Sequence, residues 1–196
     1  MLKLKFETSV THTKNLPTAY APEVAFAGRS NAGKSSAINT LAGHTGLAYV
    51  SRTPGRTQLI NIFRLDNGAA LVDLPGYGYA KVPEKISSRW RGLLETYLQQ
   101  RSCLVGLFLI LDCRRPFTDL DQQMLRWFAL TGRPVHCLLT KADKLSRQEQ
   151  NHNLGQAQRT AWQLAEERVS LQLFSSLKKT GIEEACAMIA HWLQSG

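Results

Sequence analysis

The chain alternates between short apolar runs and longer stretches in which apolar residues recur at helical spacing. Short runs are typical of buried strands, and helical spacing is typical of helices with one face on a core. The runs predict strands at 23–28, 59–65, 69–74, 103–112, 135–140 and 169–174. The periodic stretches predict helices at 34–42, 84–100, 120–128, 154–165 and 182–193. We therefore expect an α/β fold in three layers, a mostly parallel sheet with helices on both faces.

Two local features refine this fold. The polar turn at 66–68 predicts a hairpin, which places one antiparallel strand in the sheet. Residues 1–22 predict an N-terminal arm or edge strand that packs on the core, and residues 23–196 predict a single domain. A chain of 196 residues is long enough to bury a complete core in such a domain.

Composition limits the classes of protein to which the chain can belong. It is 43% hydrophobic and 20% charged, as in ordinary globular proteins. The longest apolar run, at 103–111, is too short to span a bilayer as a helix, and the N-terminus lacks a signal-peptide core. The four cysteines are widely spaced and show no metal-ligand pattern, which favours free thiols in a reducing compartment. We expect a cytoplasmic protein without a membrane partner.

The net charge of +9 indicates a polyanionic partner. The basic residues are spread along the chain rather than held in a tail, and nucleic acid, here structured RNA, is the usual partner of such a chain. A basic surface that serves only solubility is the alternative.

The most informative segment lies between the first predicted strand and the helix at 34–42, and it fits the pattern G-x-x-x-x-G-K-S/T. Its glycines let several backbone N–H groups point at one anion, and the helix N-terminus adds further donors. Lys34 can reach the outer phosphates of a nucleotide, and the Ser35 hydroxyl can hold Mg²⁺. A glycine-rich turn with an accidental match is the alternative. The residues expected to contact the nucleotide here are Gly28, Arg29, Ser30, Asn31, Ala32, Gly33, Lys34, Ser35 and Ser36.

A second motif, D-x-x-G, follows the predicted strand at 69–74. Asp73 can accept hydrogen bonds from a water bound to Mg²⁺, and the Gly76 N–H can meet a γ-phosphate. The pattern is common by chance, but its place at a strand end downstream of a phosphate loop makes it a much stronger signal. The expected site residues of this motif are Asp73, Leu74, Pro75 and Gly76.

Two further strand ends predict the choice of base. The Asp143 carboxylate can accept two hydrogen bonds from guanine, and adenine has no such pair of donors. The Lys141 stem can pack along the base plane, whereas an exposed Lys/Asp turn is the alternative for this tetrapeptide taken alone. Backbone N–H groups after the last strand can meet the guanine carbonyl. These residues are Thr140, Lys141, Ala142 and Asp143 after one strand and Phe174, Ser175 and Ser176 after the other.

The polar loop at 43–57 lies between the first two motifs. We expect Thr57 to be the second protein ligand of Mg²⁺, with an ordinary Pro-Gly turn as the alternative. The expected nucleotide contacts of this segment are Gly55, Arg56, Thr57, Gln58 and Leu59.

Taken together, the motifs resemble the Ras-like P-loop GTPases and, more closely, the EngB (YihA) family of bacterial ribosome-biogenesis GTP-binding proteins. The resemblance spans essentially the whole chain and rests on residues 28–35, 53–61, 73–80, 112–115 and 140–143. It implies binding of GTP and GDP with Mg²⁺. It also implies a monomer that acts in assembly of the large ribosomal subunit through rRNA or ribosomal proteins, and that is needed for normal growth, cell division and septation.

Two positions depart from the wider Ras-like pattern. Thr140 stands where most such proteins have Asn, although Thr is usual in the EngB family. Tyr77 follows Gly76, where Ras-like enzymes place a Gln that orients the attacking water. A phenol cannot replace that amide, so we expect slow intrinsic hydrolysis, with Lys34, Thr57 and Gly76 acting in catalysis. In related GTPases the residue matching Asn31 helps to hold K⁺, which makes Asn31 a candidate potassium ligand.

These expectations describe a switch. GTP and Mg²⁺ would order residues 44–58 and 75–88 through Thr57 and Gly76, and hydrolysis would release both segments. The second segment and the residues just beyond it suit an RNA or ribosomal-protein contact, through Tyr77, Tyr79, Lys81, Lys85, Arg89 and Arg91. One rival is a nucleotide-gated RNA- or ribosome-binding module with incidental hydrolysis, and another is a P-loop kinase of a small metabolite.

Overall fold

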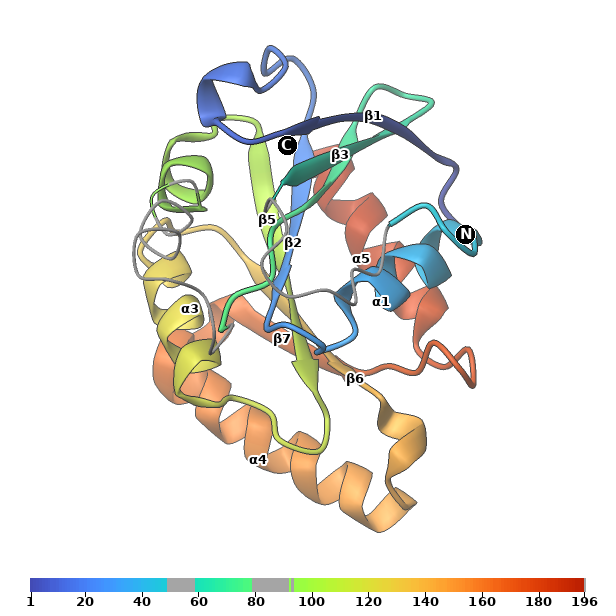
Figure 1. Ribbon diagram of the computed structural model, residues 1–196. Coiled ribbons are helices and arrows are strands. Elements are labelled where there is room, and N and C mark those ends of the chain that lie inside the picture. Colours follow the sequence, from blue (N-terminus) through green and yellow to red (C-terminus); the bar gives the residue numbers. More distant parts are fainter. Residues whose placement is uncertain (49–58, 79–91, 93, 196) are drawn as a thin grey trace.

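The computed structural model describes residues 1–48, 59–78, 92 and 94–195 (Figure 1). Within them lie the strands β1 (Leu4–Val10), β2 (Glu23–Gly28), β3 (Ile60–Leu65), β4 (Ala70–Asp73), β5 (Leu104–Asp112), β6 (Val135–Thr140) and β7 (Val169–Leu173). The helices are α1 (Lys34–Ala42), α3 (Asp119–Ala129), α4 (Arg147–Ala165) and α5 (Ile182–Ser195), and residues 94–100 are also helical. The rest of the helix predicted at 84–100 lies outside the described residues, apart from Gly92.

The described strands form one sheet in the order β1-β3-β4-β2-β5-β6-β7. β2 pairs in parallel with β4 and β5, and β6 continues the parallel part to β7. β3 pairs antiparallel with both β4 and β1, so it is the strand that runs against the others. This confirms the mostly parallel sheet with one antiparallel strand. The segment 1–22 contributes β1, which forms an edge of the sheet.

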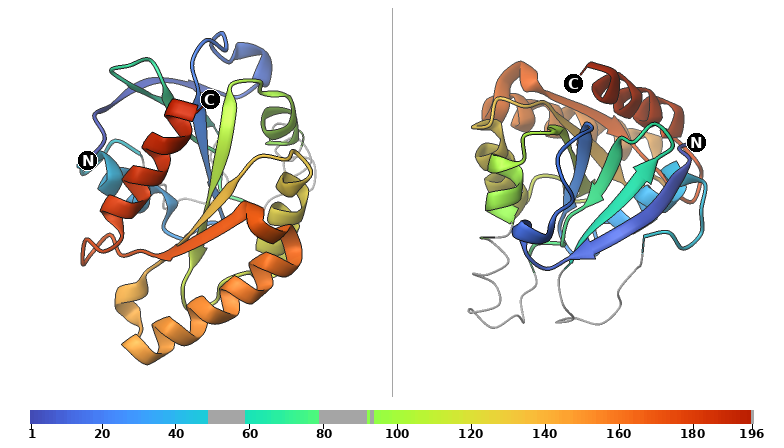
Figure 2. Two further views of the ribbon diagram at one scale, coloured as in Figure 1. Left: turned by 180° about the vertical axis from the view of Figure 1, so that it is seen from behind. Right: turned by 90° about the horizontal axis from the view of Figure 1, so that it is seen from above.

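Helices cover both faces of the sheet, as the apolar pattern predicted (Figure 2). Val24 and Phe26 point to the face covered by α1 and α5, where Phe26 stacks on Phe108 with ring centroids 5.0 Å apart. The intervening Ala25 and Ala27 point to the other face, which carries α3, α4 and the helical residues near 97. This alternation follows from the two-residue period of a strand. None of the described helices is long and apolar enough to cross a membrane.

Helix α4 begins at Arg147 rather than at Leu154, where its apolar periodicity begins. Ser146 caps the helix, because its side chain accepts from the Glu149 N–H while the Glu149 carboxylate accepts from the Ser146 N–H and hydroxyl. The first turns are polar, so they carry no periodic signal. The capping pair would have revealed the true start.

Parallel pairing brings the carboxyl ends of the central strands to one edge of the sheet, where α/β proteins bind ligands. β5 lies beside β2, with Ile110 opposite Gly28, and Asp112 of β5 lies opposite Thr140 of β6. The close approach at Gly28 requires glycine, since a Cβ there would lie 2.8 Å from the Ile110 carbonyl oxygen. The predicted motifs therefore converge at this edge.

Candidate nucleotide-binding site

The phosphate loop connects the end of β2 with the start of α1. Two of its residues adopt left-handed backbone conformations, Asn31 with φ 63° and Gly33 with φ 103°. Asn tolerates this region better than most residues, and Gly does so without strain. Gly33 is the N-cap of α1 and offers no side chain to cap the helix. The first-turn N–H groups are therefore not used by a capping side chain and can face an anion.

Lys34 and Asp73 form an ion pair at the start of α1. Lys34 Nζ donates to Asp73 Oδ1, and the two side chains are only 11% and 6% exposed. Asn61 Nδ2 lies 3.4 Å from the other Asp73 oxygen. The structure thus brings together the lysine expected to bind phosphate and the carboxylate expected beside Mg²⁺.

The oxygen donors near this ion pair fit Mg²⁺, which prefers hard oxygen ligands. Ser35 follows Lys34 on α1, and Asp73 lies against that helix turn. The described residues contain no group of three or more His, Cys, Asp or Glu side chains able to hold a metal by themselves. Mg²⁺ in a nucleotide site takes most of its ligands from phosphates and water, so two protein oxygens suit it. Thr57, the expected second ligand, lies outside the described residues, as do Gly55, Arg56 and Gln58.

The segment from Asp73 to Tyr77 runs along the phosphate loop. Leu74 N–H donates to the Phe26 carbonyl at 2.9 Å, and Leu74 and Pro75 are buried. Tyr77 N–H donates to the Gly28 carbonyl at 3.2 Å, and Ser30 N–H donates to the Tyr77 carbonyl at 2.9 Å. Gly76 is consequently held beside the loop, as its predicted role requires.

The Tyr77 side chain is buried, which corrects its expected role as an exposed RNA contact. Its hydroxyl donates to Asp121 Oδ1 at 2.8 Å. Asp121 Oδ2 lies 3.2 Å from Arg29 Nε and 2.7 Å from the Thr118 hydroxyl. Burial and then the Asp121 charge raise the pKa of Tyr77 well above its usual value. A buried, neutral phenol that is bonded to a carboxylate cannot contact RNA or a ribosomal protein. The other residues expected in that contact lie outside the described residues: Tyr79, Lys81, Lys85, Arg89 and Arg91.

Sequence reasoning missed Asp121 as part of this site. Asp121 lies at the third position of α3, where its carboxylate accepts from the Thr118 N–H and completes a capping box. The spacing T-x-x-D predicts that local role. Its contacts with Arg29 and Tyr77 depend on the packing of distant segments and have no signal in the spacing.

The end of β6 is attached directly to the phosphate loop. Thr140 Oγ1 lies within hydrogen-bond distance of the carbonyl oxygens of Ala32 and Leu111. Lys141 Nζ donates to the Asn31 carbonyl at 2.6 Å and to Asp112 Oδ2 at 2.9 Å. The hydroxyl that replaces the more usual Asn amide at position 140 therefore links the two motifs through the backbone of the loop.

The residues predicted to bind guanine also meet. Asp143 is 7% exposed, and its Oδ1 accepts from the Ser175 hydroxyl at 2.6 Å. Lys144 Nζ lies 3.8 Å from the other Asp143 oxygen. Ala142 N–H donates to the Phe174 carbonyl, which joins the loop after β6 to the loop after β7. The carboxylate is thereby oriented by a partner from the neighbouring strand.

Asp112 connects this end of the site with two cations. Its carboxylate accepts from Arg114 Nε at 2.9 Å, from Arg114 Nη2 at 2.6 Å, and from Lys141. Burial by itself would raise the pKa of Asp112, but the hydrogen bonds from Arg114 and Lys141 outweigh it and hold that pKa well below its usual range. Lys141 is in turn fixed against the phosphate loop.

The remaining predicted residues occupy ordinary positions around this centre. Ser36 is exposed on α1, and Leu59 is half-buried immediately before β3. Phe174 and Ser175 are buried, while Ser176 is half-exposed.

Comparison with known proteins identifies the family of this site. A family model described as "50S ribosome-binding GTPase" matches residues 23–141. A protein of Azoarcus sp. (strain BH72) named "Probable GTP-binding protein EngB" is 61% identical over 189 residues, which are 96% of this chain and 90% of that protein. The chain belongs to the EngB family of GTP-binding proteins. A second EngB relative, from Neisseria meningitidis serogroup B, is 56% identical over 97% of this chain and 91% of its own length.

Solved structures confirm the EngB fold. A crystal structure of a probable GTP-binding protein engB superposes with a TM-score of 0.69 at 20% identity, over 89% of this chain and 100% of that one. Era from Aquifex aeolicus, bound to GDP and AlF4⁻, gives a TM-score of 0.67 at 18% identity, over 88% of this chain and 57% of Era. Membership of EngB makes the chain a P-loop GTPase that binds GTP and GDP.

Proposed function

We propose that this EngB protein is a slow GTP-dependent switch that acts as a cytoplasmic monomer in assembly of the large ribosomal subunit. In this role it would be needed for normal growth, cell division and septation. The main support is that direct hydrogen bonds join three parts of the site: the residues predicted to bind guanine, the phosphate loop and the D-x-x-G segment. A nucleotide bound across these elements would contact all of them. Loss of its γ-phosphate would therefore change the contacts of each element.

The nucleotide would be held along the edge of the sheet. Asp143 would accept from guanine, and the N–H groups of the loop would surround the phosphates. Mg²⁺, held by Ser35, Thr57 and an Asp73-bound water, would neutralise charge on the β- and γ-phosphates. Lys34 would stabilise charge on the transferring phosphoryl group, which requires it to turn from Asp73 toward the phosphate.

The position after Gly76 supports a slow intrinsic rate. Tyr77 directs its hydroxyl to Asp121 and away from any role in orienting a water for attack. Gly76, with Thr57, would sense the γ-phosphate, but neither provides the amide that positions water in Ras-like enzymes. A rate-enhancing group would therefore come from a partner or a cation.

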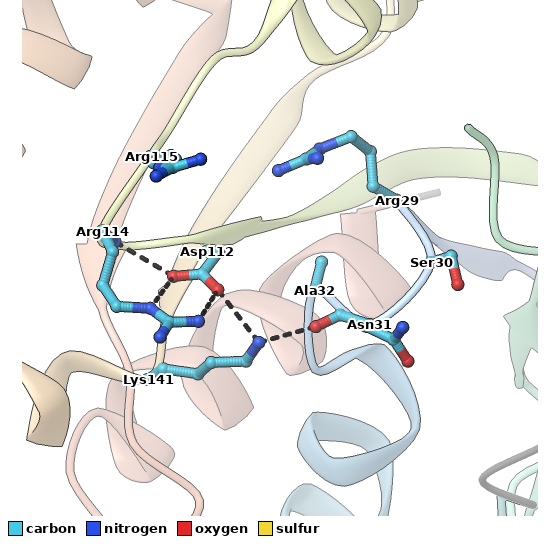
Figure 3. A pocket seen from close by; sticks show the side chains of 8 residues that line it. All are labelled: Arg29, Ser30, Asn31, Ala32, Asp112, Arg114, Arg115 and Lys141. Atoms are coloured by element: carbon cyan, nitrogen blue, oxygen red, sulfur yellow. Dashed lines mark hydrogen bonds and ion pairs between the residues drawn. The ribbon is translucent and has the colours of Figure 1, made fainter. Parts of the chain in front are cut away.

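Potassium is the cation we propose, with Asn31 as its protein ligand. Figure 3 shows the Asn31 side-chain amide directed away from Lys141, so this amide is separate from the backbone carbonyl that Lys141 binds. We expect turnover in K⁺ to exceed turnover in Na⁺ at equal ionic strength, and Asn31→Ala to abolish the difference. Equal turnover of the intact protein in the two salts would contradict this role.

Large ribosomal subunits are the expected partner. The net charge of +9 and the description of the matching family model support this choice. We expect cosedimentation with isolated large subunits in the presence of a non-hydrolysable GTP analogue, weaker cosedimentation with GDP, and faster GTP turnover when subunits are added. Binding without any stimulation would favour the nucleotide-gated binding module with incidental hydrolysis.

A further inference from the structure

A basic pocket of about 460 Å³ lies beside the phosphate loop (Figure 3). Its lining comes from the loop, from the end of β5 and from the residue after β6. The eight described residues that line it are Arg29, Ser30, Asn31, Ala32, Asp112, Arg114, Arg115 and Lys141. Four of these carry positive charge, Asp112 alone among them is acidic, and Ala32 alone is apolar. The pocket therefore suits a compact anion rather than an apolar group.

The single carboxylate among the described lining residues is already shared by two of the cations. Asp112 accepts from Arg114 and from Lys141, so both cations already have a carboxylate partner. Arg29 uses its Nε for Asp121 outside the lining. The exposed Arg115 guanidinium makes no hydrogen bond or ion pair with any described residue. Arg115 and the two terminal nitrogens of Arg29 thus remain to receive an anion.

These two arginines approach the pocket from separate segments. Figure 3 shows the Arg29 side chain extending from the loop toward Arg115. Two guanidinium groups that line one pocket repel each other unless an anion lies between them. The planar fork of a guanidinium matches the oxygens of a phosphate, so a phosphate is the anion that both could bind together.

The pocket adjoins the cradle expected to receive the nucleotide phosphates and shares loop residues with it, but it faces another side of the loop at Asn31. A phosphate loop binds its anion through backbone N–H groups, so a part of the loop that presents a carbonyl oxygen faces away from that anion. Lys141 Nζ, which lines the pocket, donates to the Asn31 carbonyl. The part of the pocket beside Lys141 therefore lies on the carbonyl side of the loop at Asn31.

We propose that Arg29 and Arg115 bind a backbone phosphate of structured RNA in this pocket. The inference rests on the proposed ribosomal function and gives it a specific contact. RNA fits better than a protein, because protein interfaces depend on apolar and aromatic anchors, and the described lining residues include no aromatic side chain and only Ala32 as an apolar one. The net charge of +9 adds long-range attraction for the same polyanion. Since Arg29 belongs to the phosphate loop, RNA bound here would touch the loop that holds GTP.

The test compares Arg115→Gln with Arg159→Gln, a matched loss of charge at an exposed residue of α4 outside the pocket. The probe is deproteinised rRNA from large subunits, and its affinity for the full-length protein is measured from about 50 to 200 mM salt. We expect Arg115→Gln to weaken RNA binding about fivefold or more and to lower the slope of log K against log salt by about 1. Arg159→Gln should change the affinity less than about twofold, and both variants should keep the wild-type affinities for GTP and GDP.

A competition experiment distinguishes an RNA phosphate from free phosphate. Inorganic phosphate, added at constant ionic strength, should weaken RNA binding by the wild type more than by Arg115→Gln. Equal RNA affinities of the two variants would overturn the proposal. So would a parallel loss of GTP affinity in Arg115→Gln, since the pocket would then belong to the nucleotide.

Failure of the ribosomal function would give a different pattern. A wild-type protein that binds neither rRNA nor intact subunits would refute the proposed function together with this contact. Binding of rRNA that Arg115→Gln leaves unchanged would remove only the contact. If Arg115→Gln weakened binding to intact subunits but not to deproteinised rRNA, the partner of this pocket would be a ribosomal protein, and the RNA assignment would be wrong.

Discussion

The predicted guanine end and the predicted γ-phosphate end of this site are held together in different ways. At the guanine end, Asp143 is oriented by the Ser175 hydroxyl at 2.6 Å, an arrangement that leaves carboxylate lone pairs available to a base. At the γ-phosphate end, the working groups are bonded to one another: Lys34 to Asp73, and Tyr77 to Asp121. One end is ready for its ligand, and the other must exchange its own contacts for those of the ligand.

This difference suggests how one site could bind both GTP and GDP and still distinguish them. A ligand shifts a conformational equilibrium only by the difference in its affinity for the two states. The base makes the same contacts in either nucleotide, so the guanine end contributes affinity without switching. In the proposed function the γ-phosphate would compete with contacts that the protein already makes, and GTP and GDP would differ in that competition.

Asp143→Asn gives the largest expected effect, because it removes the carboxylate expected to select guanine. A buried site built to bond a donor pair rejects ligands that lack it by large factors, and we expect GTP affinity to fall by at least about 10²-fold. Affinity for xanthosine triphosphate should rise, since xanthine presents an acceptor where guanine presents its amino group. Competition binding with both nucleotides measures the change. An unchanged preference for GTP would show that Asp143 does not contact the base.

Lys34→Ala tests the opposite end. A charge-assisted hydrogen bond contributes about 1.5–3 kcal/mol, so we expect GTP and GDP affinities to fall by about 10- to 100-fold. The substitution also leaves the buried Asp73 carboxylate without its cation, which should lower the free energy of unfolding.

The double variant Lys34→Ala/Asp73→Asn separates these two effects. It removes the unpaired charge, so stability in urea should recover while nucleotide affinity stays low. If affinity recovered as well, Lys34 would act by balancing Asp73 rather than by binding phosphate.

Tyr77→Phe tests whether the hydrogen bond between Tyr77 and Asp121 restrains the segment beside Gly76. The buried hydroxyl is lost while Asp121 keeps its bonds to Arg29 and Thr118, so unfolding in urea should require about 1 kcal/mol less. The ratio of GTP to GDP affinity should rise, by no more than about tenfold, because the segment beside Gly76 becomes easier to move. Tyr20→Phe, at an exposed phenol, is the control. A loss of stability with an unchanged ratio would make the Tyr77 bond purely structural.

The two ends also differ in how far they could be predicted from sequence. The motifs at strand ends predicted that Asp143, Lys34 and Asp73 meet at one edge of the sheet, where parallel pairing does bring them, and their roles toward a nucleotide stay predictions. The contact between Tyr77 and Asp121 could not be predicted, since it depends on how α3 packs beside the segment after β4. The ion pair between Lys34 and Asp73 was not predicted for a related reason. The motifs assigned Lys34 to phosphate and Asp73 to a water bound to Mg²⁺, and they did not indicate that the two side chains contact each other.

Elements were predicted well where their residues are buried. The strands β2 and β6, in which every residue is buried, have their predicted bounds. Helix α4 was placed too late because its first turns are polar and exposed, so that only the capping pair of Ser146 and Glu149 marks the start. Apolar periodicity reports burial, and it is silent wherever an element projects into solvent.

Asp112→Asn gives the smallest expected effect and tests the link between the two ends. The Asp112 carboxylate holds Lys141, which holds the phosphate loop through the Asn31 carbonyl. Its folded pKa lies below the unfolded value of about 4, so ionised Asp112 stabilises the fold above that pH, and this contribution is lost as pH falls through the folded pKa. The wild type should therefore be more stable than Asp112→Asn at neutral pH, by less than the Tyr77→Phe effect because the Arg114 partner is half-exposed. Urea unfolding should show a stability difference that is constant from pH 7 to about 5 and that shrinks below about 4.

The control is Asp66→Asn, at an exposed aspartate paired with exposed Lys5. It makes the same change in charge and should alter stability less. If the stability difference between wild type and Asp112→Asn instead grew on acidification, the prediction would be wrong. The ionised carboxylate would then destabilise the connection between the two ends rather than stabilise it.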